Sequence, residues 1–328
     1  MKKSLVCWLA TVLFFSVITM AMAAPQDKYS LPEPYLGWEK AYLKAFPQLQ
    51  KVMDVMIKTS TEQKKKPDQD ILHNRVCSAI VYWMAKEANL PKSEQKVAVA
   101  ADLLHNISKR DKKAVLTNPD VLRQCAAMVK KLKGLGYFKT SPKFWSDEKV
   151  LQIPKIGNKG GLIHHITGAL QAGQIVRQIG GFSEKDIQEL EVAILEHSTG
   201  YWYFRDMMDK AAGREGAWEV VLPEPETQIA KFAHDADLIS QFVPESVVPD
   251  GSKWRGLAKK RWGAKNKQEE GHIVYYVFFR LFEEAKSEQG KKLAQEKWAI
   301  IKPELVILMA LKPDQDPIKA LGVPTIFQ

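Results

Sequence analysis

Hydrophobic residues recur along most of this chain at the three- and four-residue spacings of amphipathic helices. Ser183 and Asp186 form the sequence pattern of a capping box, which marks a helix start. Alternating strand patterns are nearly absent; only residues 219–222 resemble a short strand, which Pro223 would end. The sequence therefore predicts an all-α fold. The predicted helices cover residues 35–58, 70–88, 91–105, 118–134, 161–179, 184–197, 225–242, 269–288 and 290–310.

Breaks in the helical pattern predict how the chain is organised. Residues 139–161 and 205–227 are rich in proline, glycine and charged residues, and residues 247–268 form a third break. Within this third break, basic residues alternate with Trp254 and Trp262, without an acidic residue between positions 253 and 267. This segment either binds nucleic acid or an anionic membrane surface or, as the simpler interpretation, forms a surface loop that the tryptophans anchor.

The first 23 residues have the three-part pattern of a secretory signal peptide. A pair of lysines precedes an apolar run over residues 5–20, and Ala21-Met22-Ala23 resembles a cleavage site. The apolar run is short for a transmembrane helix, although an uncleaved N-terminal anchor is the alternative. We therefore expect a periplasmic or secreted protein with no stable membrane span after removal of the signal.

Composition is that of an ordinary globular protein. Hydrophobic residues make up 45% and charged residues 26%, which excludes disordered, collagen-like and polytopic membrane classes. The formal net charge of +10 weakly favours anionic partners. Three cysteines are too few for a disulfide scaffold. Cys77 and Cys125, which would remain after signal removal, could pair in an oxidising compartment or stay as two buried thiols.

Several ionisable side chains fall on the apolar faces of predicted helices. A single histidine on such a face is usually a hydrogen-bonded core residue, but several on successive helices are harder to explain, because their burial is unfavourable without partners. A shared metal ion would satisfy them together, since imidazole and carboxylate groups bind Mn, Fe, Co, Ni or Zn. Helical bundles commonly build such sites from facing helices. The groups in question are His73, His105, His164, His197 and Asp237.

Leu103-Leu104-His105-Asn106-Ile107-Ser108-Lys109 resembles the signature segment of the HD-domain superfamily, whose pattern is Leu-Leu-His-Asp-Ile-x-Lys. His73 upstream and Ala236-Asp237 downstream match the family's order, and His164 and His197 resemble further histidines of some members. The resemblance covers roughly residues 70–240. It implies an HD-like helical bundle over residues 70–245, with an N-terminal helical extension over residues 24–69 and a C-terminal helical region over residues 246–328.

The resemblance implies a metal-dependent phosphohydrolase that cleaves a phosphomonoester or phosphodiester, often of a nucleotide, with a metal-activated water. The expected partner is an anionic phosphorylated small molecule rather than a nucleic acid. Lys109 holds the position of the family's lysine, which implies a catalytic and phosphate-binding role. Arg110 and Tyr201, the latter in an aromatic cluster, are further candidate substrate contacts. The implied ligands of one or two divalent ions (Mn, Fe, Mg, Co, Ni or Zn) are His73, His105, Asn106, His164, His197 and Asp237.

One position departs from the family pattern, because Asn106 stands where the family has aspartate. An amide oxygen can bind a metal but brings no charge, so metal affinity is expected to be lower. The alternative function is therefore a binding or scaffold protein on a degenerate HD fold, without turnover. Asp102 is either a carboxylate that orients the His105 ring or a surface acid. His165 for His164, and Asp235 for Asp237, are alternative ligands.

Overall fold

The computed structural model describes residues 30–63, 67–111, 118–140, 160–197, 223–242, 247–248 and 250–328. Within these ranges the chain is helical and contains no β-strand, which confirms the all-α prediction. The signal-peptide pattern, the strand-like residues 219–222 and Tyr201 lie outside the described residues. The helices are α2 (Tyr35–Ala45), α3 (Gln48–Glu62), α4 (Pro67–Glu87), α5 (Lys92–Leu104), α7 (Pro119–Gly134), α9 (Gly160–Ile179), α10 (Glu184–Glu196), α12 (Gln228–Ile239), α14 (Lys253–Trp262), α15 (Lys267–Glu283), α16 (Glu288–Leu308) and α17 (Pro317–Leu321), and a 3₁₀ turn covers Thr325–Phe327.

Side-chain caps fix several helix starts. The Ser183 hydroxyl accepts a hydrogen bond from the Asp186 amide at 3.1 Å, and the Asp186 carboxylate accepts one from the Ser183 amide at 2.9 Å. The predicted capping box of α10 is therefore confirmed. Thr227 caps α12 and Ser287 caps α16 through the side-chain hydroxyl alone, which accepts a hydrogen bond from the amide of Ala230 and of Gly290, respectively. Each cap binds a backbone N–H that the first helical turn leaves unpaired.

Two helix predictions were wrong. The single helix expected over residues 35–58 is divided into α2 and α3 at Pro47, because proline disfavours helical geometry in the residue before it. The break expected over residues 247–268 contains α14, which Ser252 caps and Gly263 ends with φ at +75°. Trp254 and Trp262 are only 2% and 3% exposed, so they do anchor this segment, but on a helix rather than a loop.

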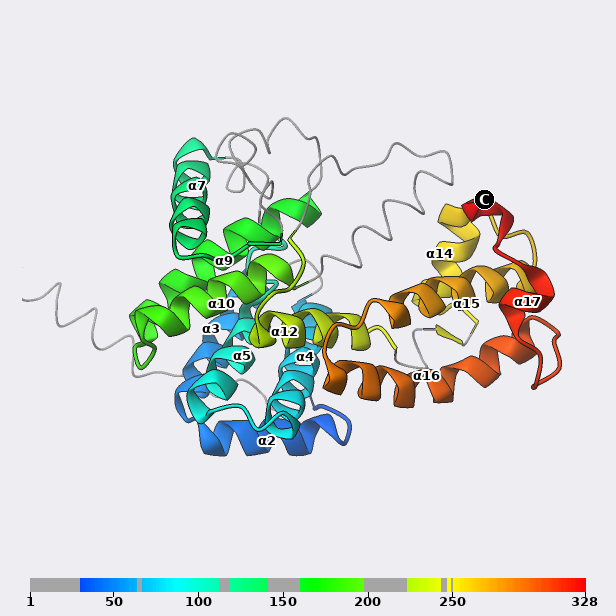
Figure 1. The fold of residues 1–328 in the computed structure, drawn as a ribbon, viewed down its shortest axis with the longest axis horizontal. Helices are drawn as coiled ribbons and strands as arrows, with labels where there is room; N and C mark the ends of the chain where they lie inside the picture. The colour runs from blue at the N-terminus through cyan, green and yellow to red at the C-terminus, as the bar shows by residue number, and fades with distance from the viewer. Residues whose placement is uncertain are drawn as a thin grey trace, which may run out of the picture.

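The helices form two groups that α16 connects (Figure 1). In the first group, α5 and α12 each contact α4 and α10, while α2 and α3 pack on α4 and α9 packs on α10. The second group, α14 to α17, lies at the other end of the molecule, and α16 contacts both α12 and α4. None of the described helices combines the length and apolar character that a membrane span requires. The first group positions the site.

Candidate metal centre

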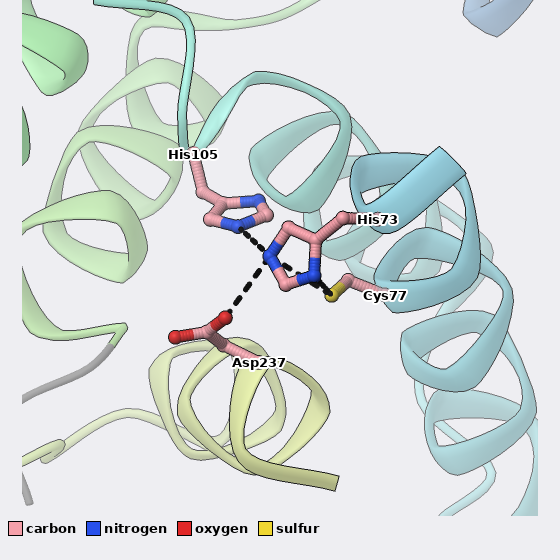
Figure 2. A group of neighbouring side chains, drawn as sticks. All are labelled: His73, Cys77, His105 and Asp237. Atoms are coloured by element: carbon pink, nitrogen blue, oxygen red, sulfur yellow. Dashed lines mark hydrogen bonds and ion pairs between the residues drawn. The ribbon is translucent and has the colours of Figure 1, made fainter. Parts of the chain in front are cut away.

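Four side chains from three parts of the chain converge at the centre of the first group (Figure 2). His73 and Cys77 lie one turn apart on α4, His105 follows the end of α5, and Asp237 lies on α12. The Nε2 atom of His73 lies 3.2 Å from Nε2 of His105 and 3.1 Å from Oδ1 of Asp237. His105 and Cys77 are fully buried, whereas the side chains of His73 and Asp237 are 18% and 16% exposed. Solvent therefore reaches the cluster at His73 and Asp237.

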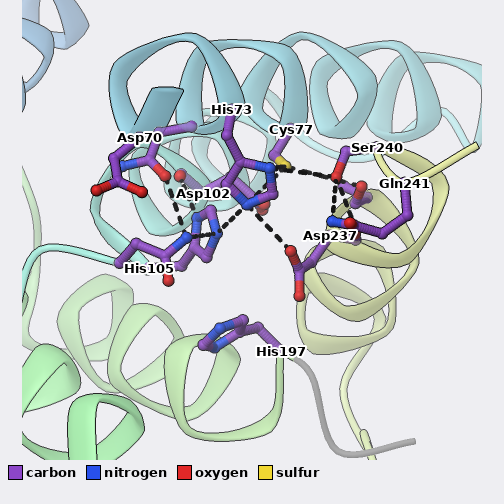
Figure 3. Close-up of polar contacts among 12 residues, drawn as sticks. Asp70, His73, Cys77, Asp102, His105, His197, Asp237, Ser240 and Gln241 are labelled. Atoms are coloured by element: carbon purple, nitrogen blue, oxygen red, sulfur yellow. Dashed lines mark hydrogen bonds and ion pairs between the residues drawn. The ribbon is translucent and has the colours of Figure 1, made fainter. Parts of the chain in front are cut away.

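Hydrogen bonds to neighbouring groups orient the imidazoles of the cluster (Figure 3). The Nδ1–H of His105 donates to the Asp102 carbonyl at 2.6 Å. In this structure Nε2 of His105 therefore has a lone pair, and Nε2 of His73 carries the hydrogen that is donated to Asp237 at 3.1 Å. The Ser240 hydroxyl gives its hydrogen to the Asp237 carbonyl at 2.7 Å, so its oxygen can accept from Nδ1 of His73 at 3.3 Å in the other tautomer, which would free Nε2 of His73 for a metal.

A second cluster consists only of imidazoles. His164 and His165 lie near the start of α9, and the ring of His165 stacks on that of His197 with centroids 4.1 Å apart. One nitrogen of each of these three residues lies within 4.8 Å of the others. His197 also joins the two clusters, since its ring centroid lies 4.8 Å from that of His105. The structure thus brings both His164 and His165 to the site and leaves the choice between them open.

Burial keeps the imidazoles of His105, His165 and His197 neutral. It lowers the pKa of His105 and His165 well below the ordinary value, and neighbouring imidazoles add to the effect. Burial also lowers the pKa of His197, to about 4. Burial alone would raise the pKa of Asp237, but the His73 hydrogen bond and the nearby imidazoles hold it well below its usual value. At neutral pH His105, His165 and His197 are therefore neutral nitrogen donors and Asp237 is an ionised carboxylate, the forms that bind metal.

Asn106 presents its nitrogen, not its oxygen, to this site. Its Nδ2 donates to Nε2 of His105 at 2.6 Å and to Oδ1 of Asn74 at 3.3 Å. Asn74 in turn donates to the Leu103 carbonyl, which orients the pair. Oδ1 of Asn106 is buried and has no hydrogen-bond partner among the described residues. For Asn106 to be a metal ligand, as the resemblance implies, its amide must turn by half a rotation.

Asp102 fits neither of its predicted roles. It is fully buried, so it is not a surface acid. Its carbonyl, rather than its carboxylate, receives the His105 hydrogen bond. Neither carboxylate oxygen has a hydrogen-bond partner among the described residues. Burial, together with the charge of Asp237, raises the pKa of Asp102 well above its ordinary value, which favours the protonated acid.

The neighbouring acids on α12 have different roles. Asp235 is fully buried and turns away from the cluster toward the start of α16. Its carboxylate accepts hydrogen bonds from the backbone amides of Lys286 and Ser287, both at 2.8 Å, and from the Ser287 hydroxyl at 2.5 Å. His234 donates to it as well, at 3.0 Å. Asp235 therefore ties α12 to α16, and Asp237 is the acid that the structure brings to the cluster.

The predicted substrate contacts differ in where the structure places them. Burial lowers the pKa of Lys109, while the charges of Asp237 and Asp70 oppose that effect, so its ammonium group interacts electrostatically with the acid of the cluster. Arg110 forms a two-point ion pair with Asp70, at 2.7 and 2.9 Å, which engages its guanidinium group. Tyr201 lies outside the described residues.

Cys77 is the cluster member that sequence reasoning did not assign. The available signal was its spacing four residues after His73, which places both side chains on one helix face. Cys77 and Cys125 are both free and buried, in agreement with the alternative of two core thiols.

In comparisons with known proteins, no protein-family model, no curated protein and no solved structure matches this chain. The fold and the site define it as an all-α protein with a candidate metal centre in its main helical group.

Proposed function

We propose that this chain is an exported metal-dependent phosphohydrolase of HD type, acting on a phosphomonoester or phosphodiester. One observation carries the proposal: His73, His105 and Asp237 are far apart in the sequence, yet Nε2 of His73 lies 3.2 Å from Nε2 of His105 and 3.1 Å from Oδ1 of Asp237. Export rests on the signal-peptide pattern of residues 1–23.

The donor atoms fit a divalent ion. Ligands that hold one ion at about 2.0–2.2 Å lie roughly 3.3–3.6 Å apart in a tetrahedral site. The two observed distances of 3.2 and 3.1 Å are within a few tenths of an ångström of that range. His73, His105 and Asp237 would hold a first ion, and the imidazoles of His164, His165 and His197 are available to a second.

A bound divalent ion supplies Lewis-acid chemistry: it activates water and withdraws charge from a phosphoryl group. The protein's own groups support that chemistry. The Lys109 ammonium, which interacts electrostatically with Asp237, would offer a positive charge to a phosphoryl oxygen. The exposed edges of His73 and Asp237 leave a path for the phosphate group of a small molecule. The buried side of the cluster, at Cys77 and His105, excludes water.

The direct test is hydrolysis of p-nitrophenyl phosphate and bis(p-nitrophenyl) phosphate by residues 24–328, first stripped of metal and then supplied with Mn²⁺, Fe²⁺, Co²⁺, Ni²⁺, Zn²⁺ or Mg²⁺. We expect turnover with at least one ion and none without. His73→Gln should abolish it, whereas His272→Gln should not, because His272 lies on α15 and bonds the Gly322 carbonyl. Absence of turnover with every ion would refute the enzyme.

The second candidate function is a binding or scaffold protein without turnover. Asn106 favours it, because its amide occupies the Nε2 lone pair of His105 that a metal would use. In that case the stripped protein would bind a divalent ion or inorganic phosphate, measurable by calorimetry, but would hydrolyse neither ester. Loss of that binding in His73→Gln would locate it at this site.

A further inference from the structure

We infer that Cys77 is a fourth ligand of this centre and directs it toward thiophilic ions, Zn²⁺ and Co²⁺, in preference to Mn²⁺ and Mg²⁺. The inference rests on the proposed metal centre and specifies which ions that centre selects.

The position of the sulfur carries this inference. Sγ of Cys77 lies 3.8 Å from both ring nitrogens of His73 (Figure 2), and it faces α12 through a long contact of 3.7 Å with the Ala236 carbonyl. Ala236 precedes Asp237, so the sulfur lies between α4 and α12, the helices that supply His73 and Asp237. A sulfur at about 2.3 Å and a nitrogen at about 2.0 Å from one ion are roughly 3.5 Å apart in a tetrahedral site. The observed 3.8 Å is slightly longer, and because Sγ is equidistant from both nitrogens, the Cys77 side chain must rotate toward Nε2 to reach an ion bound there.

Charge balance gives a second argument. Asn106 brings no charge, so Asp237 alone would place one negative charge against the two positive charges of the ion. The Cys77 thiolate supplies the second. On binding, the sulfur–hydrogen bond breaks, a sulfur–metal bond forms, and the proton leaves to solvent, so no oxidant or reductant is required.

The chemistry of the donor set then determines selectivity. Two imidazoles, one thiolate and one carboxylate match the ligand set and tetrahedral number that Zn²⁺ accepts. A thiolate is a poor ligand for Mg²⁺ and Mn²⁺, which prefer oxygen. Cys77 is fully buried, so its sulfur is shielded from solvent and faces the cluster.

Cobalt spectroscopy tests the assignment without relying on activity. Co²⁺ added to metal-free residues 24–328 should give the near-ultraviolet charge-transfer band of a sulfur–cobalt bond. Cys77→Ser should lose this band, and its Zn²⁺ affinity should fall at least about 100-fold while Mn²⁺ affinity changes less than about tenfold. Cys125→Ser is the matched control, since Cys125 is also buried and free but lies on α7. It should keep the band.

X-ray absorption of the zinc-loaded wild type gives a second measurement that needs no variant to fold. It should show one sulfur at about 2.3 Å from zinc. Cobalt or zinc bound without a sulfur neighbour would overturn the role of Cys77, even if metal-dependent hydrolysis is found. A sulfur neighbour without hydrolysis would support Cys77 and refute only the enzyme. Failure to bind either ion would overturn the role of Cys77, and the enzyme would then stand or fall by the hydrolysis test with the other ions.

Discussion

Asn106 donates its side-chain amide to Nε2 of His105 at 2.6 Å, the same atom that His105 would offer to a metal. The amide and an ion therefore compete for one lone pair. The competition arises only because the residue is asparagine, since a carboxylate at this position has no hydrogen to donate.

Asn106→Asp should bind a divalent ion about 10–100-fold more tightly than the wild type, because it removes the competing donor and adds a negative charge. Calorimetric titration of the stripped proteins measures the difference. Asn106→Ala separates the two causes, as it removes the donor without adding charge and should give a smaller gain. Equal affinities in all three proteins would show that the amide does not limit binding.

Asp102→Asn should stabilise the metal-free protein. The pKa of Asp102 is raised in the fold above its unfolded value. The free energy of unfolding therefore falls as pH rises from the unfolded pKa through the folded pKa, because only the unfolded state ionises readily in that range. Asparagine removes this effect. We expect the free energy of unfolding, measured in urea, to be about 1–3 kcal/mol higher at pH 7.5, with a smaller gain near pH 4. Asp314→Asn is the control, because Asp314 is exposed and should change little.

Local sequence patterns predicted the helices, because each amphipathic face follows from spacing within one segment. They also predicted that His73, His105 and Asp237 meet, since apolar faces must pack together. They missed α14, whose buried residues are two widely spaced tryptophans, an alanine and Arg255 in a basic segment. They could not give the orientation of the Asn106 amide or the role of Asp235. These depend on contacts between helices that are remote in the chain.

His197→Gln should flatten the pH dependence of stability of the metal-free protein. The pKa of His197 is lowered in the fold to about 4, so the unfolded state binds more protons as pH falls below about 6.5. This one group should therefore lower the free energy of unfolding of the wild type by about 2 kcal/mol when the pH falls from about 7.5 to about 5. Urea unfolding at both pH values measures this difference. His272→Gln, the control, should retain most of the wild-type difference between the two pH values. Identical pH dependence in wild type and His197→Gln would contradict the buried, neutral imidazole.

Gly290→Ala should break the connection between α12 and α16. A Cβ atom at Gly290 would lie 2.1 Å from Oδ2 of Asp235, and the buried carboxylate cannot move away without losing its hydrogen bonds to Ser287. We expect a loss of about 2–3 kcal/mol in the free energy of unfolding, from overpacking and unmade hydrogen bonds. Gly256→Ala on α14 is the control, because its Cβ meets nothing within 4 Å. It should instead stabilise the protein by about 0.5–1 kcal/mol, as alanine favours the helix. Since Asp237 lies on the same helix as Asp235, Gly290→Ala should also weaken metal binding, whereas Gly256→Ala should leave it unchanged.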